Sequence, residues 1–133
     1  MAGQTVEEVA LHPLRAGDLA DADCVGKHGT PGHGPYLVVF LELDGGRIVE
    51  SSCQTYGCPA AIACGSKLAE YVVGKTVREA RYLTPERLRA MFRKYPPGKR
   101  HCAKIAVAAL RDALDGWAEP AGCRSTISDK EGG

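Results

Sequence analysis

The sequence predicts an α+β fold in which a small antiparallel β-sheet packs against helices on one of its faces. The first observation behind this prediction is a pair of apolar stretches, residues 36–43 and 47–54, that flank Asp44-Gly45-Gly46. This tripeptide is typical of the turn of a β-hairpin. The second observation is that the later apolar patterns have the spacing of helices, the longest over residues 59–73 and 100–115.

The part of the chain before the hairpin contains one short helix and a long glycine-rich segment. Residues 5–11 form the predicted helix, with Thr5 as the N-cap and acidic residues in the first turn, and Pro13 ends it. Residues 15–35 carry five glycines and two prolines. We therefore predict that they form a loop.

Helix signals follow one another after the hairpin. Pro59 suits the first turn of a helix, because its missing N–H is not needed there, and Gly74 suits the end of that helix. Thr76-Val77-Arg78-Glu79 is a capping box that predicts a short helix. Thr84-Pro85 begins another short helix, and the last helix, over 100–115, ends at Gly116.

Length and composition limit the classes of protein to consider. We predict one domain over residues 1–116 and a flexible C-terminal tail over 117–133, which is rich in Gly, Ser and charged residues. A net charge of +1 favours neither nucleic acid nor a membrane surface as a partner. The N-terminus lacks the pattern of a signal peptide, so we expect a cytoplasmic protein with reduced thiols rather than a disulfide framework.

Two cysteines, Cys58 and Cys102, each stand at a predicted helix start. A helix N-terminus carries partial positive charge and free N–H groups, which favour the thiolate that binds metal or attacks sulfur. His101, next to Cys102, adds a second ligand or proton donor. The set indicates a metal or sulfur site more than a disulfide, and the alternative is two core cysteines beside a surface histidine.

The remaining candidates have weaker signals. His33 lies in the glycine-rich loop, where it is either a ligand or an exposed histidine, and His28 is expected to be exposed. Cys53 and Cys64 fall at predicted core positions and Cys123 falls in the tail. The sequence assigns no role to Cys24. The basic run over residues 87–94 is either a solvated helix face or a surface for an acidic partner.

Several blocks in fixed order resemble one known family, the U-type iron–sulfur cluster scaffolds (IscU, SufU and the N-terminal domain of NifU). The resemblance covers residues 12–114. The blocks that carry it are His12-Pro13-Leu14-Arg15-Ala16-Gly17, Thr55-Tyr56-Gly57-Cys58-Pro59-Ala60-Ala61-Ile62-Ala63, Gly74-Lys75-Thr76 and Pro96-Pro97-Gly98-Lys99-Arg100-His101-Cys102.

The resemblance implies a SufE/NifU-like fold and a scaffold that is not an enzyme. Its cargo would be a 2Fe–2S cluster or iron, with zinc as an alternative metal, held by Cys58, Cys102, His33 and His101. It also implies Cys102 as the persulfide acceptor, a cysteine desulfurase as the sulfur donor, and apo iron–sulfur proteins as recipients.

Two departures from the family pattern affect these expectations. Where the family has a cysteine and an aspartate before the first strand, this chain has His33 and Pro35. The chaperone-recognition segment is also altered, to Tyr95-Pro96-Pro97-Gly98-Lys99, so the resemblance does not extend to a co-chaperone. Two other functions therefore stay open: a zinc-binding module for sulfur transfer or desulfurase regulation, and a degenerate scaffold used only for protein contacts.

Overall fold

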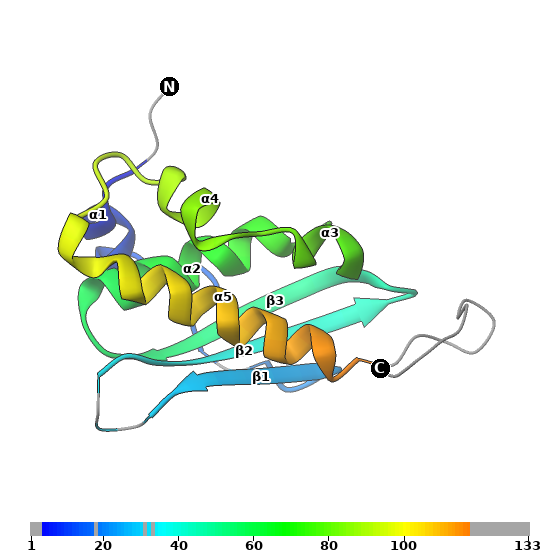
Figure 1. Cartoon of the computed structure of the whole chain (residues 1–133). Helices are drawn as coiled ribbons and strands as arrows, with labels where there is room; N and C mark the ends of the chain where they lie inside the picture. Colours follow the sequence, from blue (N-terminus) through cyan, green and yellow to red (C-terminus); the bar gives the residue numbers. More distant parts are fainter. Residues whose placement is uncertain (1–3, 18, 31, 33, 118–133) are drawn as a thin grey trace.

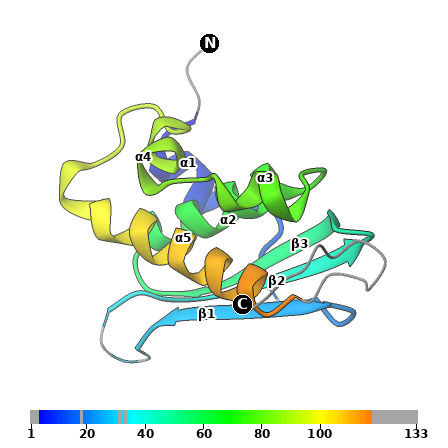
Figure 2. The ribbon, with the colours of Figure 1, turned by 45° about the vertical axis from the view of Figure 1, so that its right-hand side comes forward.

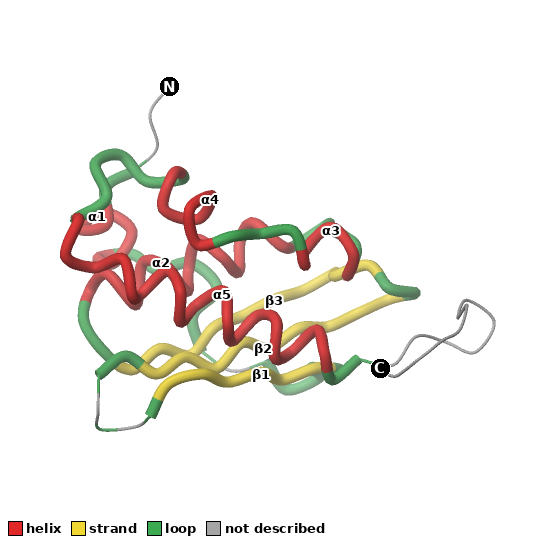
Figure 3. The backbone as a smooth tube through the Cα atoms, viewed as in Figure 1, coloured by secondary structure: helices red, strands yellow, loops and turns green. Residues whose placement is uncertain are grey.

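The computed structural model describes residues 4–17, 19–30, 32 and 34–117 of the chain. Its helices and strands, in chain order, are α1 (Val6–Leu11), β1 (Cys24–Gly29), β2 (Tyr36–Asp44), β3 (Arg47–Tyr56), α2 (Pro59–Val72), α3 (Val77–Arg81), α4 (Pro85–Ala90), the 3₁₀ turn η1 (Pro97–Lys99) and α5 (Arg100–Asp115). The three strands form one antiparallel sheet in the order β1-β2-β3. The helices lie on one face of that sheet, so the predicted α+β architecture is confirmed (Figure 3).

The core lies between the sheet and the two long helices, α2 and α5, which run side by side over it (Figures 1 and 2). Alternate residues of β2, Leu37, Val39 and Leu41, have no exposed surface. Leu68 of α2 and Leu110 of α5 are equally buried. The period of two along the strand thus gives the sheet its apolar face.

The predicted helix boundaries are confirmed where local side chains set them. The hydroxyls of Thr5, Thr76 and Thr84 accept hydrogen bonds from backbone N–H groups at the starts of α1, α3 and α4. In α1 and α3 a glutamate three residues later completes a capping box. Gly45 and Gly46 both have positive φ in the turn of the β2–β3 hairpin, as a tight turn requires.

The prediction of one continuous loop over residues 15–35 is wrong, because Cys24–Gly29 is strand β1, paired with β2. The segment contains glycines and charged residues, and its strand conformation depends on pairing with a distant segment. Gly26 shows why a glycine stands in this strand. A Cβ there would lie 2.2 Å from the backbone N of Ala113 and 2.3 Å from the carbonyl O of Ala109, so α5 crosses β1 directly on the backbone.

The end of the described chain also differs from the prediction. Trp117, which the composition places in the tail, is partly buried against the core. The rest of the predicted tail, residues 118–133, lies outside the described residues. Within the described part of the chain, no helix has the length and apolar character needed to span a membrane.

Candidate metal and sulfur site

The two cysteines of the predicted site meet where α2 and α5 begin. Cys58 is the N-cap of α2, directly after Gly57, and Cys102 is the third residue of α5. Their Sγ atoms are 3.8 Å apart, although 44 positions separate the residues in the sequence. The contact follows from the fold, because α2 and α5 pack side by side with these two ends together (Figures 1 and 2).

A small hydrogen-bond network fixes the turn that precedes α5. The hydroxyl of Tyr95 donates a hydrogen bond to the carbonyl O of Lys99. The same hydroxyl lies 3.4 Å from the Sγ atom of Cys64, which is buried in α2. Tyr95 therefore ties the segment that carries Lys99 and His101 to the body of α2.

The surroundings of the two thiols shift their pKa values in opposite directions. Burial raises the pKa of Cys58, but the backbone N–H groups of Ala61 and Ala60, the Cys102 thiol and the positive charge of Lys99 together outweigh burial and lower that pKa below its ordinary value. At Cys102, burial and then the neighbouring Cys58 thiolate raise the pKa to about 12. The pair therefore holds one thiolate readily, on Cys58, with Cys102 as its proton-bearing neighbour.

A pocket of about 490 Å³ opens beside Cys58. Its lining residues are Gly32, Gly34, Pro35, Tyr56, Gly57, Cys58, Lys99 and His101. Gly57, which has a φ of 151°, packs closely on Pro35: a Cβ at Gly57 would lie 3.1 Å from the Pro35 Cα atom. The loop before β2 and the turn before α5 therefore meet at Cys58.

Of the two histidines of the predicted site, the structure describes only His101. His101 is exposed, lines the pocket and has its Nε2 atom 3.7 Å from the Sγ atom of Cys102. His33 lies outside the described residues. Among the residues that are described, no group of three or more His, Cys, Asp or Glu side chains is close enough to hold a metal ion.

The other cysteines are buried where the structure describes them. Cys53 and Cys64 are buried, as predicted, and Cys24, which the sequence left open, is buried in β1. Cys123 lies outside the described residues. The sequence interpretation missed Lys99 and Tyr95. The only sequence feature that could have identified Lys99 is its position three residues before Cys102. Nothing in the sequence around Tyr95 indicates its contact with Cys64.

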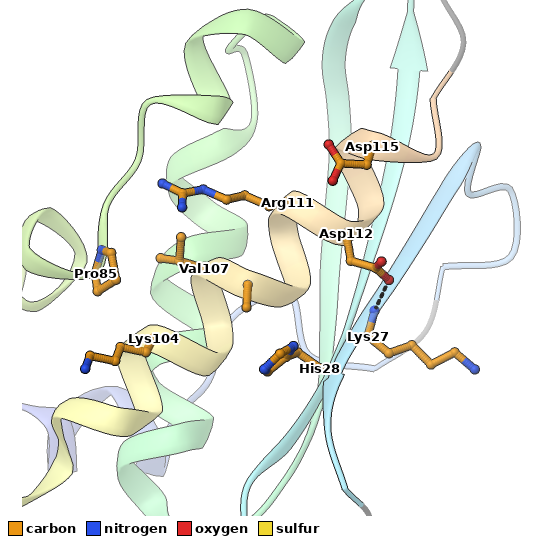
Figure 4. Close-up of a pocket in the computed structure, with 9 residues that line it drawn as sticks. Lys27, His28, Pro85, Lys104, Val107, Arg111, Asp112 and Asp115 are labelled. Atoms are coloured by element: carbon orange, nitrogen blue, oxygen red, sulfur yellow. Dashed lines mark hydrogen bonds between the residues drawn. The ribbon is translucent and has the colours of Figure 1, made fainter. Parts of the chain in front are cut away.

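A second pocket lies between β1, α5 and the start of α4, and three of its charged side chains hold neighbouring segments together (Figure 4). His28 is exposed, as predicted, but it belongs to strand β1 and not to a loop, and it points toward α5. Asp112 accepts a hydrogen bond from the backbone N–H of Lys27, and Arg111 donates one to the carbonyl O of Leu83. Asp115 forms an ion pair with Arg81. These contacts fasten neighbouring segments to α5.

Comparison of the sequence with known proteins gives one consistent result. The chain matches the profile of the NifU-like N terminal domain over residues 2–124. It is 36% identical over 103 residues to iron–sulfur cluster assembly scaffold protein IscU 1 of Archaeoglobus fulgidus, covering 77% of this chain and 67% of that protein. It is 36% identical over 107 residues to nitrogen fixation protein NifU of Cereibacter sphaeroides, covering 80% of this chain and 44% of that protein. For IscU of Aquifex aeolicus the identity is 32% over 106 residues, covering 78% and 68%.

Solved structures show the same fold. A candidate iron–sulfur cluster assembly scaffold protein for the SUF system from Fervidobacterium islandicum superimposes with a TM-score of 0.67 at 18% identity, covering 82% of this chain and 93% of that one. The N-terminal part of a NifU-like protein from Brucella abortus gives a TM-score of 0.62 at 21% identity, covering 82% and 88%. At such identities the likeness establishes the fold alone.

Proposed function

Because the chain belongs to the family of NifU-like N-terminal domains, we propose that it is an iron–sulfur cluster assembly scaffold whose cargo, a 2Fe–2S cluster or iron, binds to Cys58 and Cys102. In this function the protein carries its cargo between other proteins and is not an enzyme. We place it in the cytoplasm, with neither nucleic acid nor a membrane among its partners.

The separation of the two sulfurs is the observation that carries this proposal. Two thiolates that bind one tetrahedral metal ion at about 2.3 Å are themselves about 3.8 Å apart. The Sγ atoms of Cys58 and Cys102 have this separation of 3.8 Å. The scaffold therefore needs little rearrangement of either helix to accept a metal ion on both sulfurs.

The histidines complete the proposed ligand set. His101 lines the same pocket as Cys58, and so do Gly32 and Gly34, the residues on either side of His33. This arrangement supports His101 and His33 as the third and fourth ligands. Pro35 also lines the pocket, which supports the correspondence between its position and the aspartate position of the family.

Sulfur would come from a cysteine desulfurase and leave, with iron, to apo iron–sulfur recipient proteins. The sequence resemblance assigns the persulfide to Cys102. Cys102 has no exposed surface, whereas Cys58 is partly exposed to the pocket. Cys58 is therefore the more accessible of the two sulfurs, and Lys99, which lines the same pocket, supplies a cation for an anionic persulfide.

A second candidate function is a zinc-binding module for sulfur transfer or desulfurase regulation. The observation that favours it is the sequence before β2, where His33 and Pro35 replace the family's cysteine and aspartate. Two cysteines and two histidines form a common structural zinc set. A degenerate scaffold used only for protein contacts would bind neither metal.

Anaerobic reconstitution with ferrous iron and sulfide separates these functions. The scaffold should turn brown and keep equal amounts of iron and acid-labile sulfide after desalting. A colourless protein that retains stoichiometric zinc would support the zinc module, and one that retains no metal would support the contact function.

Cys58→Ser and Cys102→Ser should each lose most of the bound metal, while Cys53→Ser and Cys123→Ser retain it. Equal metal content in all four variants would contradict the ligand assignment.

A further inference from the structure

Cys58 and Cys102 differ in their access to solvent, although their sulfur atoms are in contact. Cys58 is partly exposed and lines the pocket, whereas Cys102 has no exposed surface. The Cys58 side chain makes no side-chain capping hydrogen bond at the start of α2. A reagent that enters the pocket therefore meets Cys58 first.

We propose that Cys58 and Cys102 form an asymmetric redox-active dithiol, in which Cys58 reacts with a small-molecule disulfide and Cys102 resolves the product. The Cys58 thiolate attacks one sulfur of the small disulfide, whose S–S bond breaks and releases one thiolate. Cys102 then gives its proton to the released thiolate, and its sulfur attacks the Cys58 Sγ atom, so that the mixed disulfide breaks and the second thiolate leaves. Counted from the dithiol, the protein loses two electrons and two protons, and the small disulfide is reduced to two thiols.

The geometry favours this pair over any other described pair of cysteines. Closing the Sγ–Sγ distance from 3.8 Å to a disulfide bond length of about 2.05 Å needs a movement of about 1.8 Å. Rotation of Cys58 at the junction between loop and helix supplies such a movement. Cys64 is the competing thiol nearby, but it is buried in α2 with its sulfur against the Tyr95 hydroxyl. Cys24 and Cys53 are buried in the strands.

The disulfide has a consequence for the same pocket. Once bonded to each other, the two sulfurs can no longer act as thiolate ligands, so oxidation and metal binding at this pair exclude one another. This inference goes beyond the proposed function, because it concerns the metal-free protein and holds whatever cargo the protein carries.

The test uses metal-free full-length protein with Cys123→Ser as the background, so that no cysteine of the tail competes. The protein is incubated anaerobically with oxidised glutathione, quenched by acid, alkylated and mapped by peptide mass spectrometry. We expect a disulfide between the Cys58 and Cys102 peptides. Added Cys102→Ser should extend the lifetime of a glutathione adduct on Cys58 by about tenfold or more, because the neighbouring nucleophile is lost. Added Cys58→Ser should leave Cys102 unmodified.

Cys53→Ser, which removes a buried thiol of β3, is the matched control and should form the same disulfide at the same rate. A glutathione adduct that persists on Cys58 while Cys102 is intact would overturn the proposal. A disulfide between Cys58 and Cys64 would also overturn it. The pairing in the background protein decides the question without the Cys102→Ser variant, so a folding defect in that variant does not weaken the test.

Discussion

At the scale of single residues, the site depends on the difference between two adjacent thiols. Cys58 faces a pocket that also contains Lys99, and its pKa is lowered, whereas the pKa of the buried Cys102 is raised. Nucleophilic reactivity follows the thiolate. Chemistry with outside reagents should therefore begin at Cys58, while Cys102 acts as an inner partner.

Lys99→Met should slow the alkylation of Cys58 in metal-free protein. The charge of Lys99 lowers the Cys58 pKa, so its removal raises that pKa and reduces the thiolate fraction at neutral pH. We expect the rate with iodoacetamide at pH 7 to fall and the pH profile to move to higher pH. Lys104→Met, on the exposed side of α5, is the control and should leave both unchanged. A profile that Lys99→Met does not move would show that this charge does not act on Cys58.

A second residue-scale prediction concerns His33 and Pro35, the two positions where the chain departs from the family's cysteine and aspartate. An imidazole is neutral where a thiolate is negative, so His33→Cys should lower the reduction potential of a bound cluster. Pro35→Asp should restore the family's carboxylate and speed cluster transfer to an apo-ferredoxin. Redox titration and transfer kinetics of the wild type, both single variants and the double variant test this. If neither substitution changes potential or rate, the proposed correspondence of these two positions with the family is wrong.

At the scale of elements, local signals predicted most of the fold and a non-local requirement explains the failure. Residues adjacent in the sequence determine the N-caps of α1, α3 and α4 and the β2–β3 turn. The sequence alone therefore locates these features. Strand β1 was missed, since its conformation depends on β2 and on the approach of α5 to Gly26. No pattern within six residues carries that information.

Gly26→Ala should therefore disrupt the packing of α5 on β1. The added methyl group would lie 2.2 Å and 2.3 Å from backbone atoms of α5, which cannot move as a side chain would. We expect a loss of about 3 kcal/mol in the free energy of unfolding, measured by urea denaturation. Gly98→Ala is the control, because a Cβ there meets no atom within 4 Å, and it should change stability little. Equal stability of the two variants would contradict the close approach.

At the scale of the whole molecule, the sequence predicted the site in outline and the structure supplied its setting. Helix starts and family resemblance pointed to Cys58 and Cys102, and the packing of α2 on α5 explains their meeting. The Tyr95 link to Cys64 and the position of Pro35 against Gly57 arise from contacts between distant segments. Neither sequence motifs nor hydrophobic periodicity indicate contacts between segments that are distant in the chain.

The buried thiols should make the folded molecule sensitive to alkali. Burial, as the main cause, raises the pKa of both Cys53 and Cys64 to about 11, from an ordinary 9.0. Between these values the folded chain keeps protons that the unfolded chain loses, so the free energy of unfolding falls as pH rises from about 9 to about 11. Between these two pH values, each thiol lowers the free energy of unfolding by about 1.4 kcal/mol per pH unit. Urea unfolding across this range should show a shallower fall in Cys64→Ala; an identical slope would contradict the assignment.

X-ray absorption at the zinc edge, with zinc as the probe ion, tests most directly whether Cys58 and Cys102 bind one metal together. The account predicts two sulfur scatterers per zinc at about 2.3 Å, with nitrogen or oxygen atoms at about 2.0 Å. Cys102→Ser should remove one of the two sulfurs from the first shell. A wild-type shell without sulfur, or a spectrum that Cys102→Ser leaves unchanged, would contradict it.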